Sequence, residues 1–402
     1  MREMEKRKLY IITCISACIA ISLIVICNML FFQNETEKKI KVGFVYVDDA
    51  STAYTYNFIK AQKTVEKEYE GNIETVVRYN VAEGDEEGVI RELAESGCDL
   101  IFSTSYGYGE TAKRIAQEYP DIQFCQATCS NANDEPVLEN YHTFMGEIYE
   151  GRYVSGVAAG LKLQELIEEG LLTPQQAKIG YVAAYPYAEV ISGYTAFFLG
   201  VRSIVPDAVM TVKYTNSWND YTLEKKYAAE LIEEGCVLIS QHSDTAGPAV
   251  ACEETDASRI VYHVGYNESM ADVAPTTYLI GCKINWTPYV RAAVAAVRKD
   301  EKIEDCVDGH VHGQDTGAGF EAGWVEMLEL NRVVATIGTD QKIQETIDAI
   351  KQGKIHVFQG DYVGVNAYDE TDILDLNDGY EENADSSAPT FSYVLKDVIT
   401  VE

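Results

Sequence analysis

Residues 41–47 read KVGFVYV, and nearly the same run returns as KIGYVAA at residues 178–184. A second pair follows at nearly equal spacing, with GCDLIF at 97–102 and GCVLIS at 235–240. Each run is short, apolar and bounded by glycine or polar residues, and a helical pattern comes after it. This arrangement is typical of buried parallel strands joined by crossover helices. The chain therefore contains one α/β unit twice.

Two copies of an α/β unit predict two Rossmann-like lobes with parallel sheets. Parallel sheets bind ligands at the carboxyl ends of their strands, so two facing lobes would share a cleft. We expect strands at residues 41–47, 73–79, 98–103, 122–127, 178–184, 235–240, 259–263 and 278–284. We expect helices at residues 54–70, 85–96, 108–119, 146–169, 288–299 and 340–352.

The same patterns divide the chain into three parts. Residues 1–40 are expected to be a membrane or signal segment followed by a linker. The first lobe would comprise residues 41–145 with a return segment at about 284–312. The second would comprise residues 146–283 with a C-terminal segment at about 313–402.

Charge and the N-terminal sequence indicate where the protein acts. The formal net charge of −32 repels phosphate backbones, so no nucleic-acid partner is expected. Residues 9–32 carry no charged side chain and are long enough to cross a bilayer as a helix. Basic residues precede this stretch, which predicts that the body lies on the extracytoplasmic face of the cell membrane. The segment is either an uncleaved anchor or a lipoprotein signal with lipidation at Cys18, because ISAC at 15–18 has the form of a cleavage box.

Motifs of catalysis and of cofactor binding are missing from the sequence. It has no nucleophile elbow, Walker loop or HExxH pair, so we expect neither an enzyme nor a resident cofactor. The G-x-G-x-x-A run at 107–112 lacks a correctly placed acidic ribose partner and is interpreted as a ligand-approach loop. His310 and His312 are interpreted as a solvated loop and not as metal ligands. The ten cysteines form no C-x-x-C pair, so no disulfide framework is predicted.

Aromatic and polar residues gather at the predicted strand ends of both copies. A flat aromatic ligand can stack between such rings while Asp and Asn side-chain oxygens accept hydrogen bonds from it. His242, at another strand end, is a candidate polar contact or a structural residue. The six candidate ligand-binding residues are Tyr54, Tyr106, Tyr185, Trp218, Asp244 and Asn267.

Several ordered motifs carry a family resemblance. CDLIFSTSYGY at 98–108, YEGRYVSGVAAG at 149–160 and residues 178–193 are similar to the basic membrane protein family of ABC-transporter substrate-binding proteins. Four shorter motifs agree with it: YTNSW at 214–218, QHSD at 241–244, VGYN at 264–267 and NWTPY at 285–289.

The resemblance implies the type I periplasmic-binding-protein fold, with three hinge crossings near residues 144–150, 265–285 and 305–315. It also implies a purine nucleobase or nucleoside as ligand and ABC permease subunits as partners. By this resemblance Trp218 and Tyr54 take stacking positions, while Asp244 and Asn267 contact the ligand. The loop at 48–53 lacks the glycines usual in this branch, and Lys283 lies one residue from a ribose-contacting position.

We therefore expect a membrane-tethered substrate-binding protein of an ABC importer that closes on its ligand. The first alternative is a ligand-sensing receptor that reports occupancy to a membrane signalling partner, which the long anchor favours. A nucleosidase is the second alternative, and it would need a carboxylate poised at the ribose.

Overall fold

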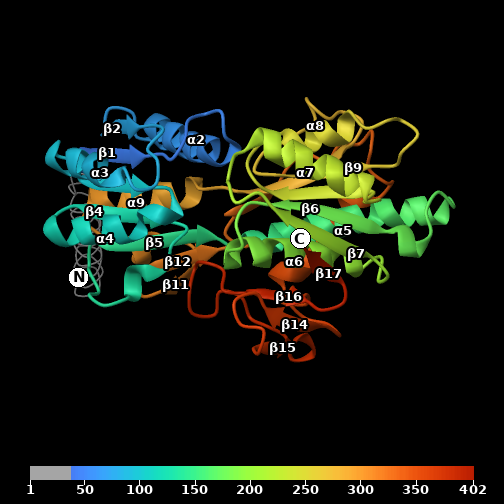
Figure 1. Ribbon diagram of the computed structural model, residues 1–402. Coiled ribbons are helices and arrows are strands. Elements are labelled where there is room, and N and C mark those ends of the chain that lie inside the picture. Colours follow the sequence, from blue (N-terminus) through green and yellow to red (C-terminus); the bar gives the residue numbers. More distant parts are fainter. Residues whose placement is uncertain (1–37) are drawn as a thin grey trace, which may run out of the picture.

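The computed structural model describes residues 38–402, which form two α/β lobes that lie side by side (Figure 1). The predicted membrane segment at 9–32 and the lipidation candidate Cys18 lie outside these residues. Within residues 38–402, no helix is both long enough and apolar enough to span a bilayer. The predicted pair of parallel-sheet lobes is confirmed.

The first lobe is built on a seven-stranded sheet in the order β11-β12-β5-β4-β3-β1-β2. All neighbours pair in parallel except the edge strand β11, which is antiparallel to β12. The strands are β1 (Ile40–Val45), β2 (Ile73–Arg78), β3 (Leu100–Ser103), β4 (Gln123–Ala127), β5 (Tyr141–Gly146), β11 (His310–His312) and β12 (Asp315–Ala318).

The second lobe repeats this plan in the order β13-β10-β9-β8-β6-β7-β17. Here the antiparallel strand is β13, which pairs with β10 at the edge of the sheet. The strands are β6 (Lys178–Ala183), β7 (Val209–Tyr214), β8 (Leu238–His242), β9 (Tyr262–Tyr266), β10 (Tyr278–Ile284), β13 (Val325–Met327) and β17 (Ile399–Val401).

Helices cover both faces of each sheet, which is why the central strands are buried along most of their length. In the first lobe α2 and α9 pack on one face, and α3 and α4 pack on the other. In the second lobe α5 and α6 oppose α7 and α8, and α11 packs on α5. The helices are α2 (Ala53–Glu68), α3 (Glu86–Glu95), α4 (Gly109–Glu118), α5 (Ile148–Glu168), α6 (Ala188–Arg202), α7 (Tyr221–Glu233), α8 (Gly247–Glu253), α9 (Thr287–Lys299), α10 (Ile303–Cys306) and α11 (Thr339–Lys351).

Glycines allow the long helices α5 and α6 to pack with their backbones in contact. A Cβ atom on Gly156 would lie 1.9 Å from the carbonyl oxygen of Phe197, and one on Gly200 would lie 2.1 Å from that of Tyr153. No larger residue fits at either position, so this pair fixes the core of the second lobe. The cysteines of the described residues are all free, and six of these seven are buried.

The chain crosses between the lobes three times. The first crossing follows β5, near Glu147, and the second follows β10, near Asn285. We expected the third near residues 305–315, and that prediction is wrong, because β12 pairs in parallel with β5 inside the first lobe. The third crossing is the segment 319–324 between β12 and β13. The return segment of the first lobe accordingly runs to Ala318, beyond the expected limit of 312.

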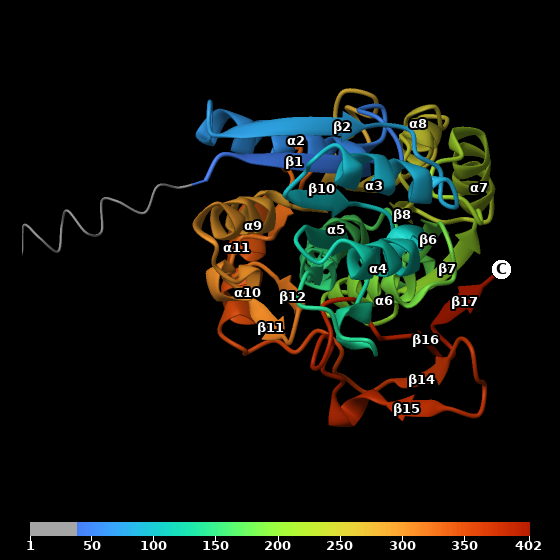
Figure 2. The same ribbon diagram turned by 90° about the vertical axis from the view of Figure 1, so that its left-hand side faces the viewer.

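The C-terminal segment adds a small sheet of its own, with the order β15-β14-β16. Figures 1 and 2 show this sheet beside the two lobes, while β17 extends the second-lobe sheet by pairing with β7. The segment also contacts both lobes through hydrogen bonds. Ser387 donates from its backbone N–H and its hydroxyl to the buried Asp315 of β12, and Ser192 of α6 donates to Glu382. The remaining strands are β14 (Val363–Asn366), β15 (Ile373–Asp375) and β16 (Tyr393–Leu395).

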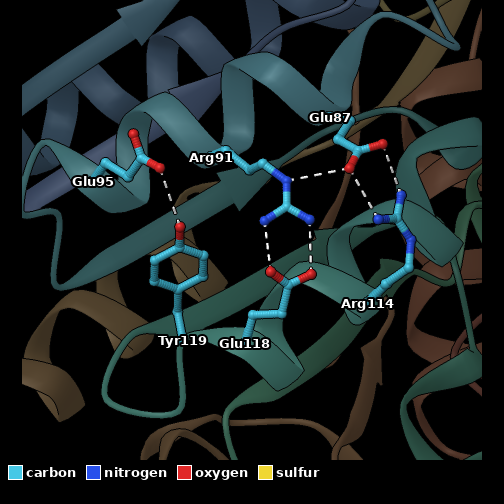
Figure 3. Close-up of polar contacts among 6 residues, drawn as sticks. All are labelled: Glu87, Arg91, Glu95, Arg114, Glu118 and Tyr119. Atoms are coloured by element: carbon cyan, nitrogen blue, oxygen red, sulfur yellow. Dashed lines mark hydrogen bonds and ion pairs between the residues drawn. The ribbon is translucent and has the colours of Figure 1, made fainter.

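On the surface of the first lobe, ion pairs join α3 to α4 (Figure 3). Arg91 donates to both carboxylate oxygens of Glu118 at 2.7 Å, and Arg114 donates to both of Glu87 at 3.0 Å. Hydrogen bonds from Arg114 and then Arg91 lower the pKa of the Glu87 carboxyl to about 2. Because these groups are exposed, solvent screens the pairs, and the network orients the helices more than it stabilises them.

Candidate ligand-binding site

A cavity of about 370 Å³ lies between the lobes at the carboxyl ends of the strands. This volume is in the range usual for small-molecule sites, about 300–1,000 Å³. The six residues expected at the site all line it: Tyr54, Tyr106, Tyr185, Trp218, Asp244 and Asn267.

Topology explains why residues so far apart in sequence meet here. Tyr54 is in the first turn of α2 after β1, and Tyr106 follows β3. In the second lobe, Tyr185, Trp218 and Asp244 follow β6, β7 and β8, while Asn267 follows β9. Each strand of a parallel sheet ends at the same edge, so one residue from each loop faces the gap between the lobes.

Aromatic rings form one wall and the mouth of the cavity. The rings of Tyr185 and Tyr187 are stacked with centroids 5.1 Å apart, and Trp218 meets Tyr185 edge-on at 5.3 Å. Tyr106 of the first lobe contacts Tyr187 of the second at 5.7 Å, and its side chain is 55% exposed. Tyr187, which the sequence analysis did not single out, packs on Tyr185 but is not among the residues that line the cavity.

Tyr54 lies on the first-lobe side and is held firmly. Its hydroxyl donates a hydrogen bond to the carbonyl oxygen of Thr104, and its ring packs edge-on against Phe58 and Trp286. Trp286 is buried and stacks on Phe58 at 4.3 Å, so it belongs to the core. This packing presents a fixed Tyr54 ring to the cavity.

Hydrogen bonds join the lobes directly across the cleft. Asn219 donates from Nδ2 to Oδ2 of Asp48 at 3.0 Å, and Asn57 of α2 donates to the carbonyl oxygen of Asn267 at 3.0 Å. Asn267 has a φ of 64°, a left-handed conformation that Asn adopts more readily than most residues. The two lobes are therefore drawn together at the positions where they line the cavity.

Asp244 provides the main polar group of the cavity floor. Its backbone N–H donates to the carbonyl oxygen of Trp218 at 2.8 Å, and its Oδ1 accepts a hydrogen bond from Asn267 Nδ2 at 3.0 Å. Desolvation, together with the nearby carboxyls of Glu224, Glu189 and Asp48, raises the pKa of Asp244 to about 8. At neutral pH the Asp244 carboxyl is mostly protonated and can donate one hydrogen bond and accept another.

Acidic residues that the sequence did not single out complete the lining. Glu83 accepts hydrogen bonds from the Ser105 hydroxyl at 2.6 Å and from the Gly107 N–H at 2.9 Å. Four lining residues carry carboxyl groups, namely Asp48, Glu83, Glu189 and Asp244. None of the described residues that line the cavity is Lys or Arg. An anionic group such as a phosphate would face the carboxyl groups of Asp48, Glu83 and Glu189, with no Lys or Arg among the described lining residues to balance its charge.

Three other sequence candidates lie outside the cavity. Lys283 forms an ion pair with Glu326 at 3.0 Å and does not line the cavity. His310 pairs through Nδ1 with Glu147 at 2.7 Å, and this hydrogen bond raises its pKa. Within residues 38–402, no group of three or more His, Cys, Asp or Glu side chains is arranged to hold a metal ion, so His312 belongs to no such group.

Two facing α/β lobes, three crossings and a cavity at the strand ends define a two-lobed solute-binding protein. The family model described as "ABC transporter substrate-binding protein PnrA-like" matches residues 39–357, and the chain belongs to this Bmp family. The match ends before the small C-terminal sheet.

Two relatives agree with this assignment, and a solved structure agrees with the fold. The chain is 31% identical over 335 residues to the purine-binding protein BAB2_0673 of Brucella abortus, covering 83% of this chain and 87% of that protein. It is 30% identical over 286 residues to the putative ABC transporter glucose-binding protein TsgA13 of Haloferax volcanii, covering 71% and 67%. An ABC-transporter solute-binding protein from Aeropyrum pernix has a similar fold, with a TM-score of 0.64, 16% identity, and coverage of 79% and 92%.

Proposed function

We propose that this ABC-transporter solute-binding protein binds a purine nucleobase or nucleoside between its lobes. The proposal rests on one observation above all: rings and hydrogen-bonding side chains from both lobes line one cavity, whose described lining includes carboxyl groups but no Lys or Arg. Rings such as Tyr185 and Trp218 suit a flat heterocycle, since stacking a base on an aromatic side chain is worth about 1–3 kcal/mol. The purine-binding relative from Brucella abortus supports the same ligand class.

The charged side chains that line the cavity narrow the class of ligand further. Asp244, Asn267 and Glu189 offer acceptors to the N–H and amino groups of a purine. The carboxyl groups of Glu189, Asp48 and Glu83 disfavour phosphorylated ligands, so nucleotides are excluded from the proposal. We also propose that the segment at residues 9–32 tethers the protein to the extracytoplasmic face of the membrane, where it delivers its ligand to ABC permease subunits.

Isothermal titration calorimetry of the full chain in detergent tests the ligand class. The panel is adenine, guanine, hypoxanthine, adenosine, inosine, AMP and glucose, the last because one relative is described as glucose-binding. At least one base or nucleoside is expected to bind, and AMP and glucose are expected not to. Binding of glucose with no binding of any purine would contradict the proposal.

A sensing role is the second candidate. A transcriptional activator of the comK gene from Bacillus halodurans shares the fold, with a TM-score of 0.58, 19% identity, and coverage of 78% of this chain and 98% of that chain. Copurification of the anchored protein from its own membrane distinguishes the two roles. Recovery of permease subunits in a ligand-dependent manner supports transport, and recovery of a signalling partner instead supports sensing.

A further inference from the structure

His242 is a buried polar side chain whose ring nitrogens make no hydrogen bond within the described residues, and its nearest acidic neighbour is Glu189. It is the last residue of β8, it lines the cavity, and only 1% of its surface is exposed. Neither ring nitrogen has a hydrogen-bond partner within residues 38–402. Buried polar atoms are normally paired, because a buried donor or acceptor without a partner destabilises the folded state. The imidazole therefore has unused hydrogen-bonding capacity beside the cavity.

The surroundings of the ring determine which nitrogen a ligand can reach. A Cβ atom added to Gly193 of α6 would lie 2.6 Å from Nδ1, so this nitrogen faces the helix. One face of the ring packs on Tyr266, with ring centroids 4.5 Å apart. Nε2 faces Glu189, whose Oε1 lies 3.6 Å away, just beyond hydrogen-bond distance. Glu189 also lines the cavity, so both groups are directed to one place.

The charge state of the ring fits a neutral hydrogen-bonding role. Burial is the main effect and lowers the pKa of His242, and the buried guanidinium of Arg152 lowers it further, against the opposing effect of Glu189. Arg152 itself donates to the Tyr181 hydroxyl, the Ser240 hydroxyl and two backbone carbonyls, so it does not compete for the imidazole. A neutral imidazole has one N–H and one bare nitrogen.

We propose that Nε2 of His242 and the Glu189 carboxylate form a polar subsite that binds a ligand group able to donate one hydrogen bond and accept another. This inference rests on the proposed purine function and identifies residues that read the ligand. Two parts of a purine ligand have this chemistry: the N3/N9–H edge of a free base and a ribose hydroxyl of a nucleoside. Either part of the ligand can form hydrogen bonds with the imidazole and the carboxylate at the same time.

Substitution at His242 tests the proposal, with calorimetry on the full chain and adenine and adenosine as probes. His242→Leu removes the polar nitrogen at similar bulk and should weaken binding about tenfold or more. His242→Gln carries an amide nitrogen near the position of Nε2 and should recover most of the loss. A purely structural role predicts instead that both variants lower the melting temperature and that glutamine does not rescue affinity. Unchanged affinity in His242→Leu would overturn the proposal.

Ligand analogues show whether the subsite binds the base edge or a ribose hydroxyl. If the base edge is bound, wild type should prefer adenine to 9-methyladenine, and His242→Leu should lose that preference. If a hydroxyl is bound, the variant should lose the preference for adenosine over its 2′- or 3′-deoxy form. Loss of neither preference would overturn the proposal. Glu189→Ala should reduce the same ligand preference. The double variant should lose less binding free energy than the two single variants together, because both side chains bind the same part of the ligand.

A ¹⁵N NMR spectrum of the imidazoles supplies a readout that stability does not affect. The chain has six histidines, and the His242→Gln variant identifies the His242 signals by their absence. Adding the probe should shift the Nε2 signal of His242 and leave its Nδ1 signal nearly in place. Purine binding with no shift at Nε2 overturns the subsite alone, whereas no purine binding by any variant overturns the proposed function itself.

Discussion

Asn219 of the second lobe donates a hydrogen bond to Asp48 of the first lobe at 3.0 Å, and both residues line the cavity. The bond joins two loops that follow strands in different sheets. It can form only when the lobes are together, so it contributes to closure and not to the fold of either lobe. The bond also raises the affinity for a ligand that bridges the lobes, because the bond and the ligand both favour the closed arrangement.

Removing this bond should weaken ligand binding without unfolding the protein. Asn219→Ala is expected to cost about 1 kcal/mol of binding free energy, which is about fivefold in affinity. Calorimetry measures the affinity, and small-angle scattering measures the mean separation of the lobes. Gln164→Ala is the control, because Gln164 makes an exposed amide hydrogen bond to Glu168 within α5. Equal affinities for the two variants would contradict the role of Asn219.

The two tryptophans near the cavity should respond differently to truncation. Trp218 lines the cavity, so Trp218→Ala should weaken purine binding about tenfold or more and leave the melting temperature nearly unchanged. Trp286 is 1% exposed and stacks on Phe58, so Trp286→Ala should cost about 3–5 kcal/mol of unfolding free energy. Calorimetry and chemical denaturation separate the effects. A Trp218→Ala protein with wild-type affinity would remove this residue from the site.

The pKa of Asp244 predicts a specific pH dependence of stability. Because the pKa of this carboxyl is raised in the folded state, from its ordinary 3.8 to about 8, folding is favoured while the group is protonated. That contribution is complete below about pH 4 and is lost as pH rises through about 8. Asp244→Asn cannot ionise, so its melting temperature relative to wild type should increase between pH 4 and pH 8 and level off above. A difference independent of pH would show that the Asp244 carboxyl is not perturbed.

The C-terminal segment should depend on Asp315 for its attachment. This buried carboxyl accepts hydrogen bonds from Ser387 and from Thr143, so Asp315→Ala leaves buried donors unpaired. We expect a loss of about 2–3 kcal/mol of unfolding free energy. Limited proteolysis should then cut faster within residues 358–402. Asp369→Ala is a suitable control, since Asp369 bonds only the exposed Thr371 of its own turn. Equal cleavage rates would mean that the attachment does not depend on Asp315.

Much of the fold followed from the sequence because its signals are local. Buried strands such as β1 and β6 read as short apolar runs, and the long helix α5 has a pattern of small residues. Strand β12 could not be recognised, because DTGA has no apolar pattern of its own and is a strand only through pairing with β5. The third crossing was misplaced for that reason.

The cavity residues that lie at strand ends could be predicted, because the sheet topology sets their position. Loops after parallel strands meet at one edge, and Trp218 and Asn267 were selected because aromatic and polar residues recur at strand ends, together with the family resemblance. Glu83 and Glu189 could not be selected, because the chain contains 64 acidic residues and nothing local distinguishes these two. The position of Glu189 at 3.6 Å from His242 Nε2 depends on how α6 packs against β8, which periodicity does not encode.

In the proposed function, both lobes enclose a flat, hydrogen-bonding ligand of the purine class. Native mass spectrometry of the full chain, purified in detergent and then released from it, tests this most directly. We predict a bound mass equal to a purine base or nucleoside, present in wild type and lost in Trp218→Ala. A bound hexose, or a purine retained equally by Trp218→Ala, would contradict the account.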